Sequence, residues 1–140
     1  MTKFGHFIQL TFPVILLVVA VACNQGVDAR VVFEGDTCTY DGPQSLVRNP
    51  LVFQYTNKTD GEDLAVLIVT LKPGFTSADL QNYKGTERPD FVDRMIAHLD
   101  TAPGNSVKEE LELDPNLEYV LACSSETQGV QSILAIWTPK

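Results

Sequence analysis

The sequence predicts an all-β fold, namely a two-layer Greek-key β-sandwich that carries a short helical insertion. Several segments alternate apolar and polar residues with a period of two, which is typical of strands with one buried face. Turn-forming Gly, Pro, Asp and Asn residues separate these segments. Six or seven such segments within 140 residues favour a single sandwich domain.

The first half of the chain contains three of these segments. Residues 31–33 begin a strand, residues 37–40 continue it past Gly35, and the turn residues 41–43 end it. Apolar residues then alternate over residues 51–55. The run 64–71 is apolar at nearly every position and rich in β-branched residues, which predicts a central strand buried on both faces.

The middle of the chain predicts helices. Thr76 and Asp79 form a capping-box pattern, and Gly85 ends the short helix that follows. A second helix is predicted from Pro89, because the next apolar residues fall at helical spacing. These residues are Phe91, Val92, Met95, Ile96 and Leu99. We therefore expect a helical insertion over about residues 76–100, laid over one end or edge of the sheet.

Strand patterns return after the insertion. Over residues 107–113 apolar and charged side chains alternate except at Glu109, which breaks the apolar face; the pattern predicts a strand with one solvated face. Residues 117–123 and 131–138 form the last two predicted strands.

The N-terminus resembles a bacterial lipoprotein signal. A basic start precedes an apolar run over residues 8–22, shorter than the about 20 residues of a membrane-spanning helix. The run ends in Ala20, Val21 and Ala22, directly before Cys23, which is similar to the lipobox that signal peptidase II cuts. The resemblance implies a signal peptide at 1–22, a lipidated Cys23 with a tether at 23–30, and a domain at 31–140. An ordinary signal peptide, cut after Ala22 or Ala29, is the alternative.

The cysteine count fits this interpretation. If Cys23 carries a lipid, Cys38 and Cys123 can form a disulfide, and no odd thiol is exposed to an oxidising compartment. The alternative is a free buried thiol on each of two strands.

The acidic composition indicates which classes of partner the chain can bind. The net charge is −8, and the Lys and Arg residues are scattered singly among carboxylates. Such a surface repels phosphate backbones, so we expect no nucleic-acid partner. Membrane attachment would rest on the lipid at Cys23, with the domain exported to the cell membrane or outer envelope.

The late strand carries a family resemblance. Tyr119 to Cys123 is similar to the penultimate strand of cupredoxins, which has the pattern G-x-Y-x-F-x-C; Leu117 stands at the Gly and Leu121 at the Phe. Residues 34–43 resemble the first strand of a group of uncharacterised bacterial lipoproteins with copper-free cupredoxin-like domains. Over roughly residues 30–140, the resemblance implies a cupredoxin-like sandwich.

The residues needed for copper are missing from this pattern. A blue-copper site needs a thiolate, two imidazoles and a weak axial ligand. Cupredoxins place a His and a Met shortly after the cysteine, whereas residues 124–129 contain neither. The two histidines of the chain are His6, in the signal peptide, and His98, on the predicted second helix. We therefore expect no copper and no other cofactor.

An immunoglobulin-like sandwich is the alternative fold. Its hallmarks are a core Trp soon after the first cysteine and a Tyr two residues before the second. In this chain Trp137 follows both cysteines, and Tyr119 lies four residues before Cys123.

The sequence predicts a binding or accessory module rather than an enzyme. It contains no Gly-rich phosphate loop, zinc-ligand spacing or nucleophile elbow. The candidate binding segments are residues 42–49, the helical insertion, and residues 124–129. Two other hypotheses stay open: a redox or metal-handling protein that uses Cys123, and an enzyme that uses His98 with the helical insertion as a lid. Asn57 and the acidic residues after it are expected to form a solvated turn.

Overall fold

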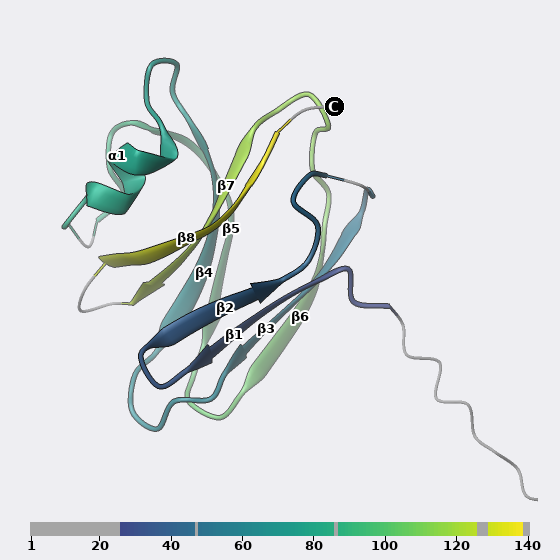
Figure 1. Cartoon of the computed structure of the whole chain (residues 1–140), viewed down its shortest axis with the longest axis vertical. Coiled ribbons are helices and arrows are strands. Elements are labelled where there is room, and N and C mark those ends of the chain that lie inside the picture. Colours follow the sequence, from purple (N-terminus) through teal and green to yellow (C-terminus); the bar gives the residue numbers. More distant parts are fainter. Residues whose placement is uncertain (1–25, 47, 86, 126–128, 139–140) are drawn as a thin grey trace, which may run out of the picture.

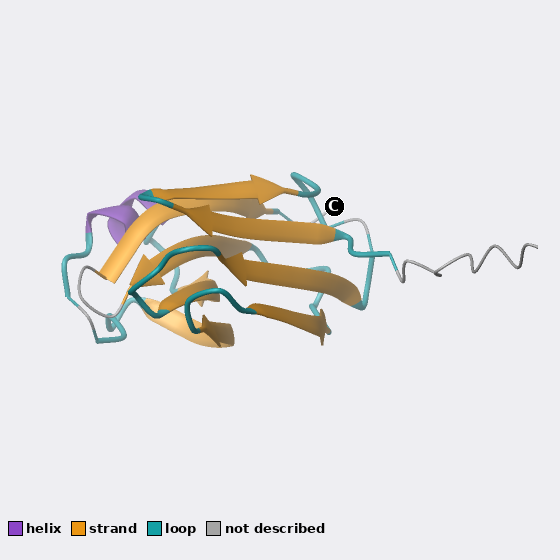
Figure 2. Cartoon of the chain, turned by 90° about the horizontal axis from the view of Figure 1, so that it is seen from below, coloured by secondary structure: helices purple, strands orange, loops and turns teal. Residues whose placement is uncertain are grey.

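The computed structural model describes residues 26–46, 48–85, 87–125 and 129–138. In these residues, eight strands form two four-stranded sheets that face each other as two layers (Figures 1 and 2). The predicted all-β, two-layer sandwich is therefore confirmed. The strands are β1 (Ala29–Glu34), β2 (Thr37–Asp41), β3 (Leu51–Asn57), β4 (Leu64–Leu71), β5 (Val92–Thr101), β6 (Ser106–Leu111), β7 (Tyr119–Ser125) and β8 (Gly129–Trp137).

The two sheets differ in strand direction. The first sheet has the order β2-β1-β3-β6, in which β1 is parallel to β3 and the other pairs are antiparallel. The second sheet has the order β5-β4-β7-β8 and is antiparallel throughout. Immunoglobulin domains build both sheets from antiparallel strands, so the parallel pair argues against that alternative.

The main core fills the space between the sheets. Its largest side chain, Trp137 at the end of β8, is fully buried. The Trp137 Nε1 donates hydrogen bonds to the Pro43 carbonyl oxygen (3.0 Å) and to Tyr40 Oη (3.2 Å), and Tyr40 Oη donates to the same carbonyl (2.7 Å). Burial raises the pKa of Tyr40. These bonds join the segment after β2 to the last strand of the opposite sheet.

The single described helix, α1 (Ser77–Asn82), covers the outer face of the second sheet (Figure 1). The Asp79 carboxylate accepts hydrogen bonds from the Thr76 N–H (2.7 Å) and hydroxyl (2.9 Å), as the capping-box pattern predicts. The same bonds hold the pKa of Asp79 below its usual range. Leu80 points from α1 into a second apolar cluster on this face. The helix ends at Asn82, with Tyr83 as its C-cap, rather than at Gly85.

The predicted second helix is wrong, and with it the extent of the insertion over 76–100. Residues 92–101 instead form β5, an edge strand paired with β4. Asp93 and Ile96 have no partner in the β4 register, so each forms a β-bulge that shifts the strand by one residue. Met95 consequently packs on the outer face, while Ile96 and Leu99 pack into the main core. Two bulges thus convert a period of two into a spacing that resembles a helix.

The predicted signal peptide at 1–22 and the lipidation site at Cys23 lie outside the described residues. In the part of the chain that is described, no helix has the length and apolar character needed to cross a membrane.

Candidate functional site

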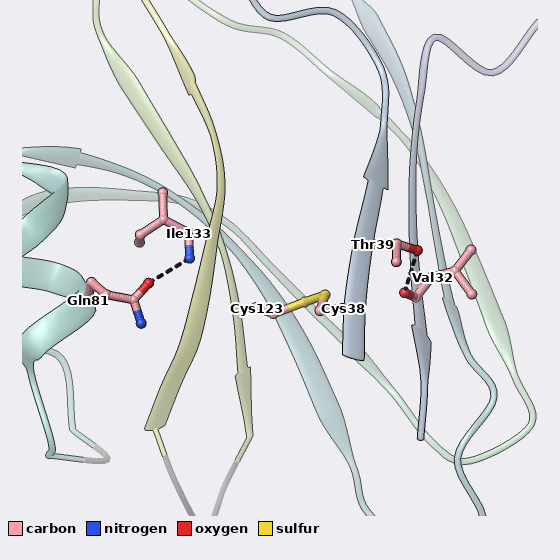
Figure 3. The surroundings of a disulfide bond; sticks show 6 residues. All are labelled: Val32, Cys38, Thr39, Gln81, Cys123 and Ile133. Carbon is pink, nitrogen blue, oxygen red and sulfur yellow. Dashed lines mark hydrogen bonds between the residues drawn. A yellow bond between two sulfur atoms is a disulfide. The ribbon is translucent and has the colours of Figure 1, made fainter. Parts of the chain in front are cut away.

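The predicted disulfide between Cys38 and Cys123 is present (Figure 3). It joins the edge strand β2 of the first sheet to β7 inside the second sheet, and the two Cα atoms lie 6.6 Å apart. Cys123 is 1% exposed and belongs to the main core. Its sulfur is bonded to Cys38, so in this state it is not a thiolate that could bind a metal.

His98 lies on the other side of the sheet from Cys123. Cys123 pairs with Val66 and faces the main core, whereas His98 pairs with Leu67, whose side chain faces outward. The sheet itself therefore separates the imidazole from the sulfur. Within the described ranges, no three His, Cys, Asp or Glu side chains come together where they could hold a metal ion.

A cavity of about 270 Å³ lies on the outer face of the second sheet; we call it the outer-face pocket. Strands β4, β5, β7 and β8 form its floor, and α1 with the segment after it forms its cover. Its lining residues are Leu67, Val69, Leu80, Tyr83, Gly85, Glu87, Arg88, Pro89, Val92, Met95, His98, Ser124, Ser125, Gly129 and Val130.

The strand register sets a polarity gradient along this pocket. At one end Val69 of β4 pairs with Met95. Two residues along β4 on the same face, Leu67 pairs with His98 of β5. Two residues further along β4, Ala65 pairs with Ser124 of β7. The pocket is therefore aliphatic at the Val69 end and polar at the Ser124 end.

Two side chains hold the cover in place. From α1, Gln81 Nε2 donates to the Gln131 carbonyl oxygen (3.1 Å), and Gln81 Oε1 accepts from the Ile133 N–H (2.9 Å; Figure 3). Arg88 Nη2 donates to the carbonyl oxygens of Val92 (2.8 Å) and Asp93 (2.6 Å) at the start of β5. The helix is thus fixed to one edge of the sheet and the following segment to the other.

The polar end combines an imidazole with two serines. His98 and Asp100 lie two residues apart on β5, so their side chains share the outer face, and His98 Nε2 is 3.1 Å from Asp100 Oδ1. Both are exposed at the rim, whereas Ser124 and Ser125 are 8% and 5% exposed. The arrangement offers a hydrogen-bonding head group several polar partners next to an apolar surface.

A close backbone approach bounds the pocket near β8. Gly129 has a φ of +67°, and a Cβ atom built on it would lie 2.7 Å from the Gly85 carbonyl oxygen. Glycine is the residue that allows both this backbone conformation and this approach. No residue pattern pairs Gly85 with Gly129 in advance, because the contact depends on the tertiary fold.

Two of the three predicted binding segments meet at this pocket. Ser124 and Gly129 line it together with α1, although residues 126–128 between them lie outside the described residues. The segment 42–49 does not contribute, since Pro43 contacts Trp137 on the opposite side of the sheet. Sequence reasoning missed the aliphatic floor, which needs the register of four strands.

The acidic residues of the turn after β3 are exposed or half-buried, as predicted, whereas Asn57 is not solvated. Asn57 is fully buried, and its Nδ2 donates to the carbonyl oxygens of Glu62 (2.8 Å) and Thr101 (2.9 Å). Its Oδ1 accepts from the Thr59 N–H (2.9 Å) and hydroxyl (2.7 Å). The Asn57 side-chain amide therefore holds the turn together and joins it to the end of β5.

A larger cleft of about 920 Å³ lies at one end of the sandwich. Exposed turn residues line much of it, among them Gly35, Asp36 and Gly61. It lacks the enclosing helix and the aliphatic floor of the outer-face pocket, so the smaller cavity is the better candidate for a ligand.

No protein-family model and no curated protein sequence matches the chain. Among solved structures, the chain is similar to Na-dithionite reduced auracyanin from the photosynthetic bacterium Roseiflexus castenholzii. The two are 18% identical, with a TM-score of 0.45 over 67% of this chain and 81% of that chain. The two four-stranded sheets agree with the predicted all-β, two-layer sandwich.

Proposed function

We propose that the protein is an exported lipoprotein whose sandwich is a non-catalytic binding domain, anchored to the membrane through a lipid on Cys23. The outer-face pocket is its binding site. One observation carries this proposal: a helix held by hydrogen bonds at the sheet edge covers an aliphatic cavity that the strands alone would leave open to solvent. Enclosed apolar cavities with a few converging polar groups are typical of small-molecule sites.

The disulfide supports the binding hypothesis over the redox alternative. In that alternative Cys123 acts as a free thiolate, whereas here its sulfur is bonded to Cys38 inside the core. The proposed domain uses this bond to hold its two sheets together while the outer face remains available to a ligand.

A fragment screen by NMR tests the binding site. We would use the full chain carrying Cys23→Ser, which cannot be acylated, and record amide shifts with neutral, acidic and basic aromatic compounds. We expect binders to shift signals from residues that line the pocket.

Two tryptophan variants provide the comparison. Leu67→Trp fills the pocket and should abolish the shifts, whereas Ile136→Trp, at an exposed position of the same sheet outside the pocket, should preserve them. Shifts that survive Leu67→Trp unchanged would place the binding site elsewhere and contradict the proposal.

A further inference from the structure

We propose that the outer-face pocket takes a small, uncharged, amphipathic molecule: an apolar ring or short chain that ends in one hydrogen-bonding head such as a hydroxyl. This inference rests on the proposed function and specifies the chemistry of the ligand. The size, the polarity gradient and the placement of charges lead to it.

The size of the cavity limits the ligand. About 270 Å³ is slightly below the roughly 300–1,000 Å³ usual for ligand pockets, so it suits a single ring or a short chain. The distance along β4 from Val69 to Ala65 is four residues, or about 13 Å. A molecule of this length can reach from the aliphatic end to the polar end.

The polarity gradient orients the ligand. Val69, Met95 and Leu80 form the aliphatic end, where an apolar body loses contact with water. His98 pairs with Leu67, two residues along β4, and Ser124 pairs with Ala65, two residues further, so both polar side chains line the other end of the pocket. A purely apolar ligand would cover these groups without bonding to them, and covering an unbonded polar group costs free energy. A head that forms a hydrogen bond avoids this cost.

The charges at the polar end argue against an ionised head. An anionic head at the polar end would approach the carboxylate of Asp100, on a chain with a net charge of −8. The cation that lines the pocket, Arg88, lies at the aliphatic end and already donates to two backbone carbonyls. A cationic head would meet the Asp100 carboxylate only in competition with His98. An uncharged head has neither penalty.

Three probes with one body and different heads test the inference on the full chain carrying Cys23→Ser. They are propylbenzene, 4-propylphenol and 4-propylbenzoate, and their dissociation constants are measured from amide shifts. We expect the phenol to bind about twofold to tenfold more tightly than propylbenzene, the equivalent of one net hydrogen bond. We expect the benzoate to bind most weakly of the three.

Variants at the polar end locate the effect. Ser124→Ala and His98→Ala should each reduce the preference for the phenol, because the phenol loses a hydrogen-bond partner and propylbenzene no longer covers an unbonded polar group. Glu110→Gln, on β6 of the other sheet, is the control and should leave all three affinities unchanged.

The outcomes separate this inference from the proposed function. If propylbenzene binds as tightly as the phenol, or the benzoate binds most tightly, the inference about the head is overturned while the binding site stands. If no probe shifts the residues that line the pocket, the proposed function fails together with the inference.

Discussion

Two buried tyrosines in the core differ in how their hydroxyls are satisfied. Tyr119 Oη accepts a hydrogen bond from the Asp114 N–H (2.7 Å) and donates to the Asp114 carbonyl oxygen (3.2 Å). Tyr55 is fully buried, and its hydroxyl has no partner among the described residues. The Tyr119 hydroxyl therefore stabilises the fold, whereas the Tyr55 hydroxyl lowers stability because it loses its bonds to water without gaining a partner.

The same substitution should therefore have different effects at these two positions. We expect Tyr119→Phe to lower the free energy of unfolding by about 1–2 kcal/mol, because a bonded backbone group loses its partner. Tyr55→Phe should leave it unchanged or raise it by up to about 1 kcal/mol. Urea unfolding of both variants at pH 7 measures the difference. Equal losses at the two positions would show that the Tyr55 hydroxyl is bonded in solution.

Alkaline pH provides a second measurement of Tyr55. Burial, and then the negative charge of Asp100, raises the pKa of Tyr55 in the folded state. The stability that depends on a neutral phenol is therefore fully present below about pH 10, the value for an exposed tyrosine, and declines above it. Tyr55→Phe should make the unfolding free energy less dependent on pH in that range.

At the level of strands, the disulfide connects elements that share no sheet. Strand β2 pairs only with β1 in its own sheet, and Cys38 ties it to β7 in the other. The bond spans 85 residues of sequence, so it restricts the unfolded chain strongly. In the chain-entropy model a loop of this length corresponds to about 4–5 kcal/mol.

Removal of the disulfide is therefore expected to weaken the whole sandwich. The double variant Cys38→Ala, Cys123→Ala should lose about 4 kcal/mol of unfolding free energy in urea. The comparison is Thr39→Ala, on the same strand as Cys38. It removes one exposed side-chain hydrogen bond to the Val32 carbonyl oxygen of β1 and should change the unfolding free energy by less than about 1 kcal/mol. A double variant as stable as the parent chain would mean that packing alone holds β2 in place.

The sequence predicts β4 correctly as a strand, whereas it predicts a helix where the structure has β5. Residues 64–71 form one uninterrupted strand, as their apolar, β-branched run predicts. In β5 the bulges at Asp93 and Ile96 change which face each residue occupies, and local sequence does not reveal them. The same error placed His98 on a helix. The candidate pocket was beyond sequence analysis for a related reason, since its floor depends on the pairing of four strands.

For the molecule as a whole, the proposed anchor sets where the sandwich lies. Ala29, the first residue of β1, lies six positions after Cys23, so an extended tether reaches about 20 Å. Two or three acyl chains on Cys23 would bind the membrane stably. The domain would therefore remain close to the bilayer surface.

Cell fractionation tests the anchor. We expect Cys23→Ser to move the protein from the membrane fraction to the soluble fraction, and the mass of the parent protein to include the acyl chains. The double variant Cys38→Ala, Cys123→Ala retains Cys23 and should stay in the membrane fraction. An unmodified Cys23 in the mature protein would favour the ordinary signal peptide instead.

The bonds from Gln81 to β8 also affect how copies of the molecule meet. Strand β8 is one of the two edge strands of the second sheet, and an uncovered edge can pair with a strand from another chain. The Gln81 amide occupies the Gln131 carbonyl oxygen and the Ile133 N–H, the groups that such a strand would use. The side chain that fastens the cover of the pocket thereby also protects this edge against intermolecular β-sheet growth, which would matter if the proposed lipid anchor concentrates the protein on a membrane surface.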